Sequence, residues 1–229
     1  MAAAGAADMR QPGNVDDPYA MARDVMLNHD IRARGVTNET VITAMAAVPR
    51  HLFVPASQRE YSYNDYPLPI GEGQTISQPY IVAAMTELIE PRADHVVLEV
   101  GTGSGYQAAV LAKLVKHVYT IEIVEPLGRA AQQRLVELGC TNVSVRIGDG
   151  YAGWPEHAPF DGIVVTCGAK QVPPPLVKQL KPGGRMVIPV GPNQGVQDLL
   201  VVEKDEHGNV RERNVMAVRF VPLTGPSVK

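Results

Sequence analysis

The strongest constraint on the fold is an alternation of short apolar runs with helical stretches over residues 93–190. This alternation is typical of βαβ units, in which helices join parallel strands and cover the sheet. Two further apolar runs, 199–202 and 215–221, flank a polar turn and predict a C-terminal antiparallel hairpin. The predicted strands before that hairpin are 95–100, 118–122, 143–147, 162–166 and 185–190, and the predicted helices are 105–115, 126–138 and 173–180. The fold class is therefore α/β with a mostly parallel sheet.

The segment before the sheet has helical patterns instead. Residues 17–35 and 37–48 carry apolar side chains at helical spacing, and a third helix should start at Pro79 and stop before Pro91. Residues 51–73 are rich in proline, glycine and tyrosine without a sustained period, which indicates a structured loop. We expect a flexible tail over 1–17 and one domain over 18–229, with a helical segment and active-site loop in 18–92 and the sheet in 93–229.

Composition limits the partners of the chain. The 229 residues carry 21 Lys and Arg against 24 Asp and Glu, a net charge of -3, without the basic surface that nucleic-acid binding requires. Cys140 and Cys167 give no metal-site spacing, no apolar run is long enough to span a bilayer, and the N-terminus lacks a signal-peptide pattern. We expect a cytoplasmic protein without metal, membrane or nucleic-acid partners, and we take it to be a monomer.

A glycine-rich turn follows the first predicted strand, with Gly101, Gly103 and Gly105 directly before a helix. Glycines let the backbone approach a ligand, and the N–H groups of the helix start point to the same place. A dinucleotide fingerprint requires a small residue where this chain has Tyr106, and the third glycine falls one residue early. NAD is therefore the weaker interpretation, and a nucleotide-linked dehydrogenase or epimerase is the second hypothesis.

Two acidic positions follow the next two predicted strands. Glu122 lies about 20 residues beyond the first glycine, where a carboxylate can accept both hydroxyls of a ribose, and Asp149 and Gly150 form the turn after the third strand. The carboxyl ends of parallel strands meet at one edge of the sheet, so the three turns should line one crevice. A single glycine turn can be a mere connection, but three in this register favour an adenosine ligand.

This arrangement resembles the Rossmann-like class I methyltransferase sandwich. The resemblance implies S-adenosylmethionine as cofactor and S-adenosylhomocysteine as product, with the glycine loop at the methionine part, the acidic residue at the ribose and the Gly-Asp turn at the adenine. Glu99 can be a ligand or only a support for the loop. The residues implied at the cofactor are Glu99, Gly101, Thr102, Gly103, Gly105, Tyr106, Glu122, Ile123, Asp149 and Gly150.

The methyl acceptor is favoured to be a carboxylate. The turn after the fourth strand, residues 166–170, lacks the (Asp/Asn)-Pro-Pro-aromatic sequence expected for exocyclic amines, and the six histidines are not tied to the motifs. A carboxylate needs no general base, because with a pKa near 4 it is ionised about 1000:1 at neutral pH. Positioning then supplies most of the acceleration.

Longer motifs outside the glycine loop narrow the family. They are Val48-Pro49-Arg50-His51-Leu52-Phe53-Val54-Pro55, Tyr66-Pro67-Leu68-Pro69-Ile70-Gly71, Gly73-Gln74-Thr75-Ile76-Ser77-Gln78-Pro79-Tyr80, Pro189-Val190-Gly191 and Arg219-Phe220-Val221-Pro222-Leu223-Thr224. Over about residues 18–225 the chain resembles the protein-L-isoaspartate O-methyltransferase family. The resemblance implies methylation of the free α-carboxylate of L-isoaspartyl residues in damaged proteins and peptides, as a step of protein repair.

The resemblance also implies the acceptor residues. Ser77 is the catalytic candidate that helps hold the acceptor carboxylate, and Thr75, Val190 and Thr224 join it in substrate binding. Gln74, Thr75, Ile76 and Ser77 are expected to contact the cofactor as well. Without the family, a serine two residues before a helix-initiating proline is more typical of an N-cap or a turn. The two roles are compatible, because a helix N-terminus attracts a carboxylate.

Two other hypotheses about the function stay open. One is a class I methyltransferase with a small-molecule carboxylate or hydroxyl as acceptor. The other is a non-catalytic adaptor that keeps the cofactor fold, which the intact Gln-Thr-Ile-Ser segment over residues 74–77 disfavours.

Overall fold

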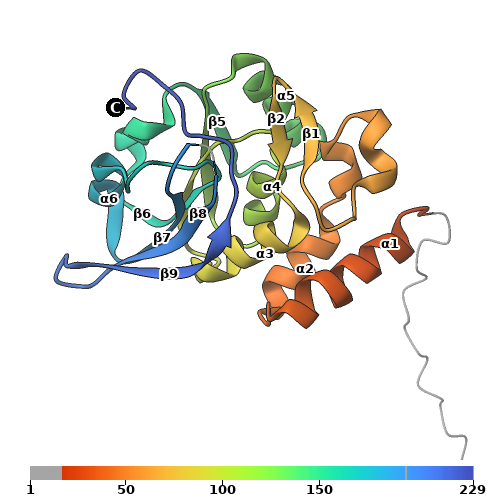
Figure 1. The fold of residues 1–229 in the computed structure, drawn as a ribbon, viewed down its shortest axis with the longest axis horizontal. Helices are drawn as coiled ribbons and strands as arrows, with labels where there is room; N and C mark the ends of the chain where they lie inside the picture. Colours follow the sequence, from red (N-terminus) through yellow and green to blue (C-terminus); the bar gives the residue numbers. More distant parts are fainter. Residues whose placement is uncertain (1–16, 194, 229) are drawn as a thin grey trace, which may run out of the picture.

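The structure is a computed structural model that describes residues 17–193 and 195–228. Its centre is a seven-stranded sheet in the order β5-β4-β3-β6-β7-β8-β9, in which β3 to β7 are parallel and β8 and β9 antiparallel (Figure 1). This confirms the predicted, mostly parallel sheet that ends in an antiparallel hairpin. The strands are β3 Val96–Val100, β4 His117–Glu122, β5 Val143–Ile147, β6 Phe160–Val165, β7 Leu180–Val190, β8 Gln197–Lys204 and β9 Val210–Val218.

Helices cover both faces of this sheet. Val97 and Leu98, neighbours on β3, are fully buried in two different apolar clusters, because successive side chains of a strand point to opposite faces. The first cluster includes side chains of α2, α3 and α4, and the second includes side chains of α6. Burial on both faces explains the nearly continuous apolar runs of the parallel strands. The helices are α1 Ala20–Val25, α2 Glu39–Ala47, α3 Pro79–Leu88, α4 Tyr106–Ala112, α5 Glu125–Glu137 and α6 Pro174–Gln179.

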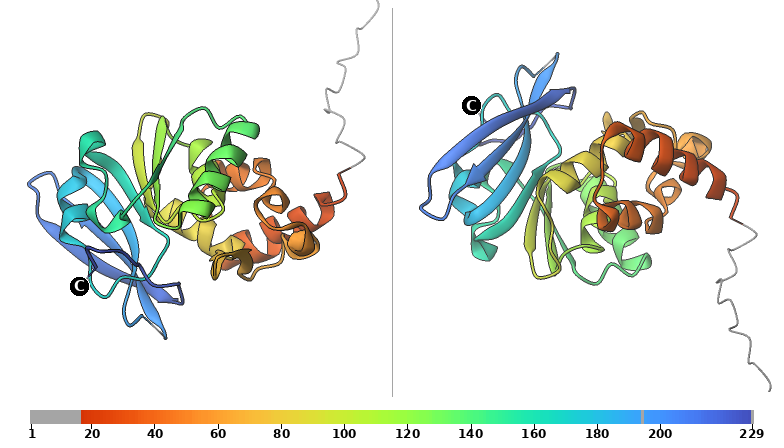
Figure 2. Two further views of the ribbon diagram at one scale, coloured as in Figure 1. Left: turned by 90° about the horizontal axis from the view of Figure 1, so that it is seen from above. Right: turned by 90° about the horizontal axis from the view of Figure 1, so that it is seen from below.

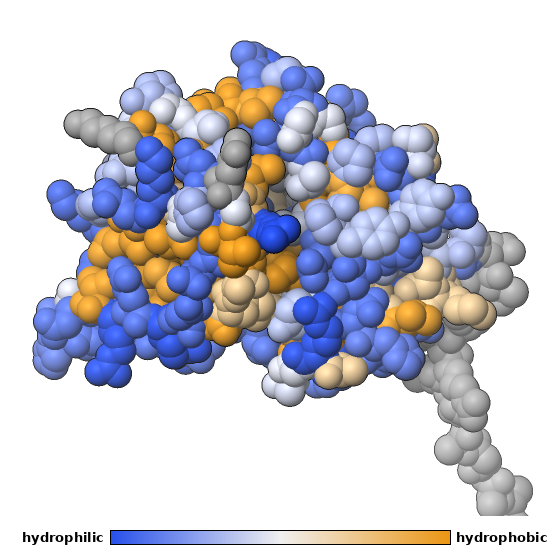
Figure 3. Space-filling view, viewed as in Figure 1, coloured by the Kyte–Doolittle hydropathy of each residue, from blue (hydrophilic) through white to orange (hydrophobic). Residues whose placement is uncertain are grey.

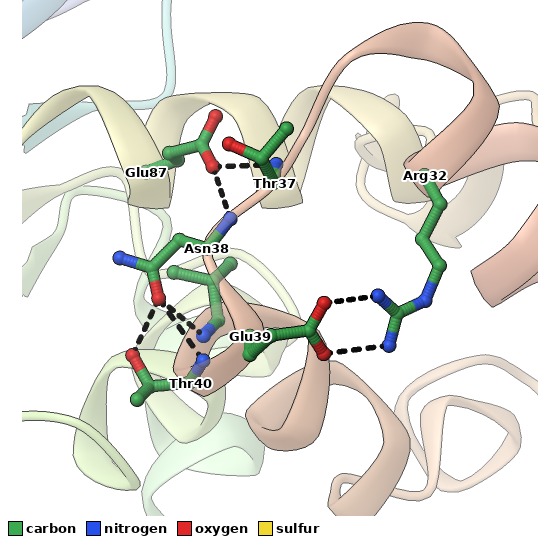
Figure 4. A network of polar contacts seen from close by, with 7 residues as sticks. Arg32, Thr37, Asn38, Glu39, Thr40 and Glu87 are labelled. Atoms are coloured by element: carbon green, nitrogen blue, oxygen red, sulfur yellow. Dashed lines mark hydrogen bonds and ion pairs between the residues drawn. The ribbon is translucent and has the colours of Figure 1, made fainter.

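The N-terminal helices are fastened to α3 by polar contacts (Figure 4). One carboxylate oxygen of Glu87 accepts hydrogen bonds from the backbone N–H groups of Thr37, at 2.8 Å, and Asn38, at 2.6 Å. The Asn38 side chain caps α2, and Glu39 in its first turn pairs with Arg32. Figure 2 shows these helices on one side of the molecule and the C-terminal strands on the other. Helix α3 therefore lies between the N-terminal helices and the C-terminal strands, in contact with α2 and β7.

The first predicted helix is not continuous. After α1 the chain forms a π-helical turn over Met26–Ile31 and a 3₁₀ turn over Arg32–Arg34, and it ends at Gly35 with a φ of +97°. Ala22 and Val25, which the period placed on the apolar face, are exposed. The wider π turn rotates the helix face, so a period of 3.6 residues does not hold across it. The expected tail, except for Asp17, lies outside the described residues.

The predicted loop over residues 51–73 contains regular structure that the sequence pattern did not predict. Two 3₁₀ turns, Arg50–Phe53 and Ala56–Tyr61, precede a hairpin in which β1, Leu68–Gly71, pairs with β2, Gln74–Ile76. The two strands have four and three residues, which is too short for a visible alternation of side chains. None of the helices in the described part of the chain has the length and apolarity needed to cross a membrane.

Two predicted strands have wrong boundaries. β7 begins at Leu180, where residue 185 was expected, and β9 spans Val210–Val218 in place of 215–221. The first half of β9 is exposed and charged, and it pairs with β8 through its backbone. An exposed edge strand shows no apolar run, so its start is hidden from a hydropathy pattern.

Candidate active site

A crevice lies at the carboxyl ends of β3 and β4, where ligands bind in open α/β sheets. It brings together residues 74–77, 99–104, 121–124 and 221–224, which are far apart in the sequence. Most of the predicted site residues meet here. Those that line the crevice are Gln74, Thr75, Ile76, Ser77, Glu99, Gly101, Thr102, Gly103, Tyr106, Glu122, Ile123, Gly150 and Thr224.

Three predicted residues do not line the crevice. Gly105 precedes α4 with a φ of +88°, and a Cβ atom there would lie 3.4 Å from Leu135 of α5. The carboxylate of Asp149 accepts a hydrogen bond from the Ser227 backbone N–H at 2.9 Å. Val190 is half-buried at the end of β7 and bridges to Ala169. Their ligand contacts stay predictions.

Two of the glycine positions at the crevice are packed too closely to accept a side chain. Gly101 has a φ of +100°, and a Cβ atom there would lie 2.4 Å from Oγ1 of Thr166. A Cβ atom on Gly150 would lie 2.5 Å from Cγ1 of Val100. Both distances are far below van der Waals contact. These two turns therefore require glycine, because any side chain would collide with Thr166 or Val100 at the ends of the strands beside the crevice.

Glu99 is a buried carboxyl group at this crevice. Its Oε2 accepts a hydrogen bond from Oγ1 of Thr120 at 2.5 Å, and Oε1 has no partner within the described residues. Burial raises the pKa of Glu99 to about 8, the hydrogen bond from Thr120 opposes this rise, and the charge of Glu122 adds to it. Oε2 of Glu99 thus links β3 to Thr120 of β4, and Oε1 has no hydrogen-bond partner among the described residues. An unsatisfied carboxylate oxygen fits a cationic group such as the ammonium or sulfonium of S-adenosylmethionine.

Glu122 joins the two loops of the cofactor side. Its Oε2 accepts from the N–H of Gly103 at 2.7 Å and its Oε1 from the N–H of Val124 at 2.9 Å. The side chain is 6% exposed and lines the crevice. Each carboxylate oxygen has a second lone pair, so ribose hydroxyls can still be accepted there. The residues present therefore fit the implied cofactor.

Ser77 does not cap α3, so the N-cap role expected for a serine at this position is wrong. The N-cap residue of α3 is Gln78, and its own side chain makes no capping hydrogen bond. Oδ1 of Asp65 accepts a hydrogen bond from the N–H of Tyr80 at 2.9 Å, so a carboxylate of the protein already occupies this helix start. Ser77 is half-buried and lines the crevice. Its hydroxyl is thereby left for a ligand.

Arg50 holds the Ser77 turn in place, a role that sequence reasoning missed. Its side chain is fully buried, Nη2 donates to the carbonyl oxygen of Ser77 at 2.6 Å, and Nε donates to that of Ser62 at 2.7 Å. The guanidinium lies 4.8 Å from the ring centroid of Tyr106. Burial lowers the pKa of Arg50, although Tyr106 opposes this shift. The motif over residues 48–55 marked Arg50 as part of the family pattern. It could not show which residues Arg50 contacts, because Ser62 and Ser77 are distant in sequence.

Thr166 was missed as well. Its Oγ1 donates to the carbonyl oxygen of Gly101 at 2.6 Å, and the residue lines the crevice directly after β6. Its place at the carboxyl end of the fourth parallel strand was the available signal. The hydroxyl fixes the first glycine of the loop.

A second hollow of about 710 Å³ opens between the first turn of α3 and the end of β9, and we call it the outer groove. It shares Thr75, Ser77, Thr166 and Val221 with the crevice, so the two hollows are adjacent. In Figure 3 this face is hollowed near its centre, and apolar side chains gather over the C-terminal strands. The turn that carries Ser77 lies at the junction of the two hollows.

The doubly wound sheet and its crevice define a Rossmann-like class I methyltransferase that uses S-adenosylmethionine. A protein-family model described as Protein-L-isoaspartate(D-aspartate) O-methyltransferase matches residues 21–228. The chain belongs to this family. The resemblance seen in the sequence motifs is thereby confirmed.

Curated relatives and solved structures agree. Protein-L-isoaspartate O-methyltransferase 2 of Syntrophobacter fumaroxidans is 56% identical over 98% of this chain and 93% of that protein. The protein of the same description from Polaromonas sp. is 62% identical over 82% of this chain and 89% of that protein. A solved protein-L-isoaspartate O-methyltransferase is 30% identical with a TM-score of 0.79, over 89% of this chain and 66% of the solved one. A Plasmodium falciparum structure in complex with S-adenosyl-L-homocysteine, 24% identical over 88% of this chain and 98% of its own, has the same fold with a TM-score of 0.74.

Proposed function

We propose that the crevice holds S-adenosylmethionine, that the outer groove holds the damaged peptide, and that the two meet at Ser77. The enzyme transfers a methyl group to the free α-carboxylate of L-isoaspartyl residues, the repair activity of its family. The assignment of the cofactor to the crevice and of the peptide to the outer groove is supported by one observation: Thr75 and Ser77 line both hollows. A peptide in the groove would therefore meet the cofactor beside these residues.

On the cofactor side, the chain supplies a cradle of backbone and two carboxylates. When bound, S-adenosylmethionine supplies an electrophilic methyl group: the acceptor oxygen bonds to the methyl carbon while the electron pair of the broken carbon–sulfur bond stays on sulfur. Glu99 faces the positive part of the ligand, and Glu122 accepts from the ribose. The proposed cofactor residues are Gln74, Thr75, Ile76, Ser77, Glu99, Gly101, Thr102, Gly103, Gly105, Tyr106, Glu122, Ile123, Asp149 and Gly150.

On the acceptor side, orientation is the main task. A carboxylate is already ionised at neutral pH, so no residue has to remove a proton. The Ser77 hydroxyl donates a hydrogen bond to one carboxylate oxygen and leaves the other free to attack, and Arg50 keeps the backbone of Ser77 fixed. Thr75, Val190 and Thr224 bind the peptide around it. Ser77 is the catalytic residue of this proposal, and Arg50 is a positioning residue.

The proposal also covers the partners, the oligomeric state and the location of the protein. Isoaspartyl proteins and peptides are the partners, and the net charge of -3 supports a protein without nucleic-acid or membrane partners. We take residues 18–229 to act as a single domain, as a monomer in the cytoplasm, with residues 1–17 as a tail.

The direct test is radiolabelled methyl transfer to a peptide with one L-isoaspartyl residue, beside its twin with normal aspartate. The isoaspartyl peptide should be labelled and the twin should not, because only the isoaspartyl linkage places a free α-carboxylate in this position. Equal labelling of both peptides, or no labelling of either, contradicts the proposal. The Ser77→Ala variant is the matched control, since it should lose much more of its labelling rate than of its affinity for S-adenosylhomocysteine.

A further inference from the structure

The outer groove has a positive charge balance that the rest of the chain does not have. Among the residues that line it, the charged side chains are Arg34 and Arg219, and no Asp or Glu belongs to the lining. The whole chain has a net charge of -3. A cationic groove on an anionic protein attracts acidic ligands more than basic ones.

The two arginines differ in how far their charges are compensated. Arg34 pairs with Asp65, and its guanidinium lies 3.5 Å from the ring centroid of Tyr80. Arg219 is exposed, and it forms no ion pair with any part of the chain that the structure describes. Arg219 is therefore the charge in the groove that is left for a ligand.

The backbone next to Arg219 is held firmly. The Gln197 side chain is 1% exposed; its Oε1 accepts from the N–H of Phe220 at 2.7 Å, and its Nε2 donates to the Phe220 carbonyl oxygen at 3.2 Å. The carbonyl oxygen of Val221 accepts from the N–H of Gly168 at 2.8 Å. The Arg219 side chain thus starts from a fixed point at the groove, although its tip is in solvent. A charge on a rigid base is more selective than one on a mobile loop.

The course of an extended peptide passes this charge. β9 is at the end of the sheet order and pairs with β8, so among the described strands its outer edge has no partner. The chain continues from that edge through Arg219 and Val221 to Thr224 in the crevice. Peptides commonly bind in extended form along such an edge. A peptide whose isoaspartyl residue is in the crevice therefore has neighbouring residues beside Arg219.

We propose that Arg219 determines specificity, and that the enzyme prefers isoaspartyl sites with an acidic residue within about five positions of the damaged one. This inference rests on the proposed function. Arg219 and Thr224 are five positions apart in the sequence. An extended peptide bound alongside this segment covers the same distance with about the same number of residues. A lysine of the peptide at the same position is repelled by Arg219, which weakens binding of the peptide.

The test is a peptide series with one L-isoaspartyl residue and a single Glu, Gln or Lys at each of the five neighbouring positions on either side. At low ionic strength, about 20 mM, kcat/KM for the best Glu peptide should exceed that of its Lys twin by about three- to tenfold, because Glu gains and Lys loses the free energy of one exposed charge pair. At about 1 M salt the ratio should fall toward one, because exposed charges are then screened. The side on which the preference occurs gives the direction of the peptide.

Three variants assign the effect to Arg219. In Arg219→Gln the Glu-to-Lys ratio should fall close to one, and in Arg219→Glu it should invert. Arg213→Gln removes the same charge from the exposed part of β9 outside the groove, and should keep the wild-type ratio. Methylation of the neutral Gln peptides without a Glu-to-Lys preference, or a preference that survives in Arg219→Gln, overturns this inference and leaves the proposed function intact. No methylation of any isoaspartyl peptide overturns both.

Discussion

The two walls of the crevice are built in different ways. The sheet wall, residues 99–104 and 121–124, consists of the ends of two neighbouring strands and the turns that follow them. The opposite wall, residues 74–77 and 221–224, comes from a short hairpin near the N-terminus and from the chain beyond β9. The sheet wall is local in sequence, and in the proposed function it holds most of the cofactor. The opposite wall is assembled from distant segments and holds the acceptor in that proposal, so changes in the two walls should have separable effects.

The largest effect is expected at Gly101 in the sheet wall. In Gly101→Ala the new Cβ would lie 2.4 Å from Thr166 Oγ1 at a φ of +100°, which costs about 1–3 kcal/mol of strain and obstructs the cradle. Binding of S-adenosylhomocysteine, measured by calorimetry, should weaken by about 100-fold. Gly139→Ala is the control, because its φ is +71° with nothing within 4 Å. That variant should lose stability and keep its affinity, and the reverse pattern refutes the assignment.

Ser77→Ala tests the opposite wall. Loss of one hydrogen bond to a charged acceptor, about 1.5–3 kcal/mol, should lower kcat by about 10- to 100-fold, with a much smaller loss of S-adenosylmethionine affinity. Steady-state kinetics and calorimetry measure the two quantities separately. Ser144→Ala, on β5 with its hydroxyl 2.9 Å from Nε2 of His117, is the control and should keep both. Weakened cofactor binding with normal turnover would contradict the assignment of Ser77 to the acceptor.

Glu122→Gln should give the complementary result. Its carboxylate accepts from the N–H groups of Gly103 and Val124, and an amide can accept through only one of its two end atoms. Affinity for S-adenosylmethionine should fall by about tenfold, while kcat at saturating cofactor stays near wild type. If the walls act independently, the double variant with Ser77→Ala shows both losses unchanged. Strong coupling between the two substitutions would break the comparison.

Glu99→Gln should show the smallest effect, on stability. The folded pKa of about 8 lies above the value of 4.5 for a free carboxyl group, so ionisation favours the unfolded state increasingly from pH 4.5 to 8 and by a constant amount above. The amide removes this penalty but loses part of the hydrogen bond from Thr120. Relative to wild type, the stability of the variant should therefore rise steadily between pH 5 and 8 in denaturant unfolding. A difference that does not vary with pH, like that expected for exposed Glu212→Gln, would contradict this.

The same contrast explains what the sequence could predict. The parallel strands were visible because both of their faces are buried, and the glycine turns because local backbone geometry requires them. The hairpin of β1 and β2 was not visible, since strands of four and three residues show no period. The start of β9 was hidden because its exposed charges give no apolar run.

The missed site residues share a physical reason. Arg50 acts on Ser77 across 27 positions, and Thr166 acts on Gly101 across 65. Contacts of this separation depend on the finished fold, which no local propensity encodes. Glu122 was predictable because its place at the end of a strand already determines its role. The Ser77 contact with the acceptor rested on family resemblance alone.

If the peptide lies in the outer groove and meets the cofactor at Ser77, as proposed, this arrangement limits which damaged sites can be repaired. An isoaspartyl residue inside an intact helix or sheet cannot enter, because its neighbours would first have to leave their own hydrogen bonds and lie open in the groove. Repair is then gated by local unfolding of the client protein, and hydrogen-exchange protection around a lesion should forecast how fast it is methylated.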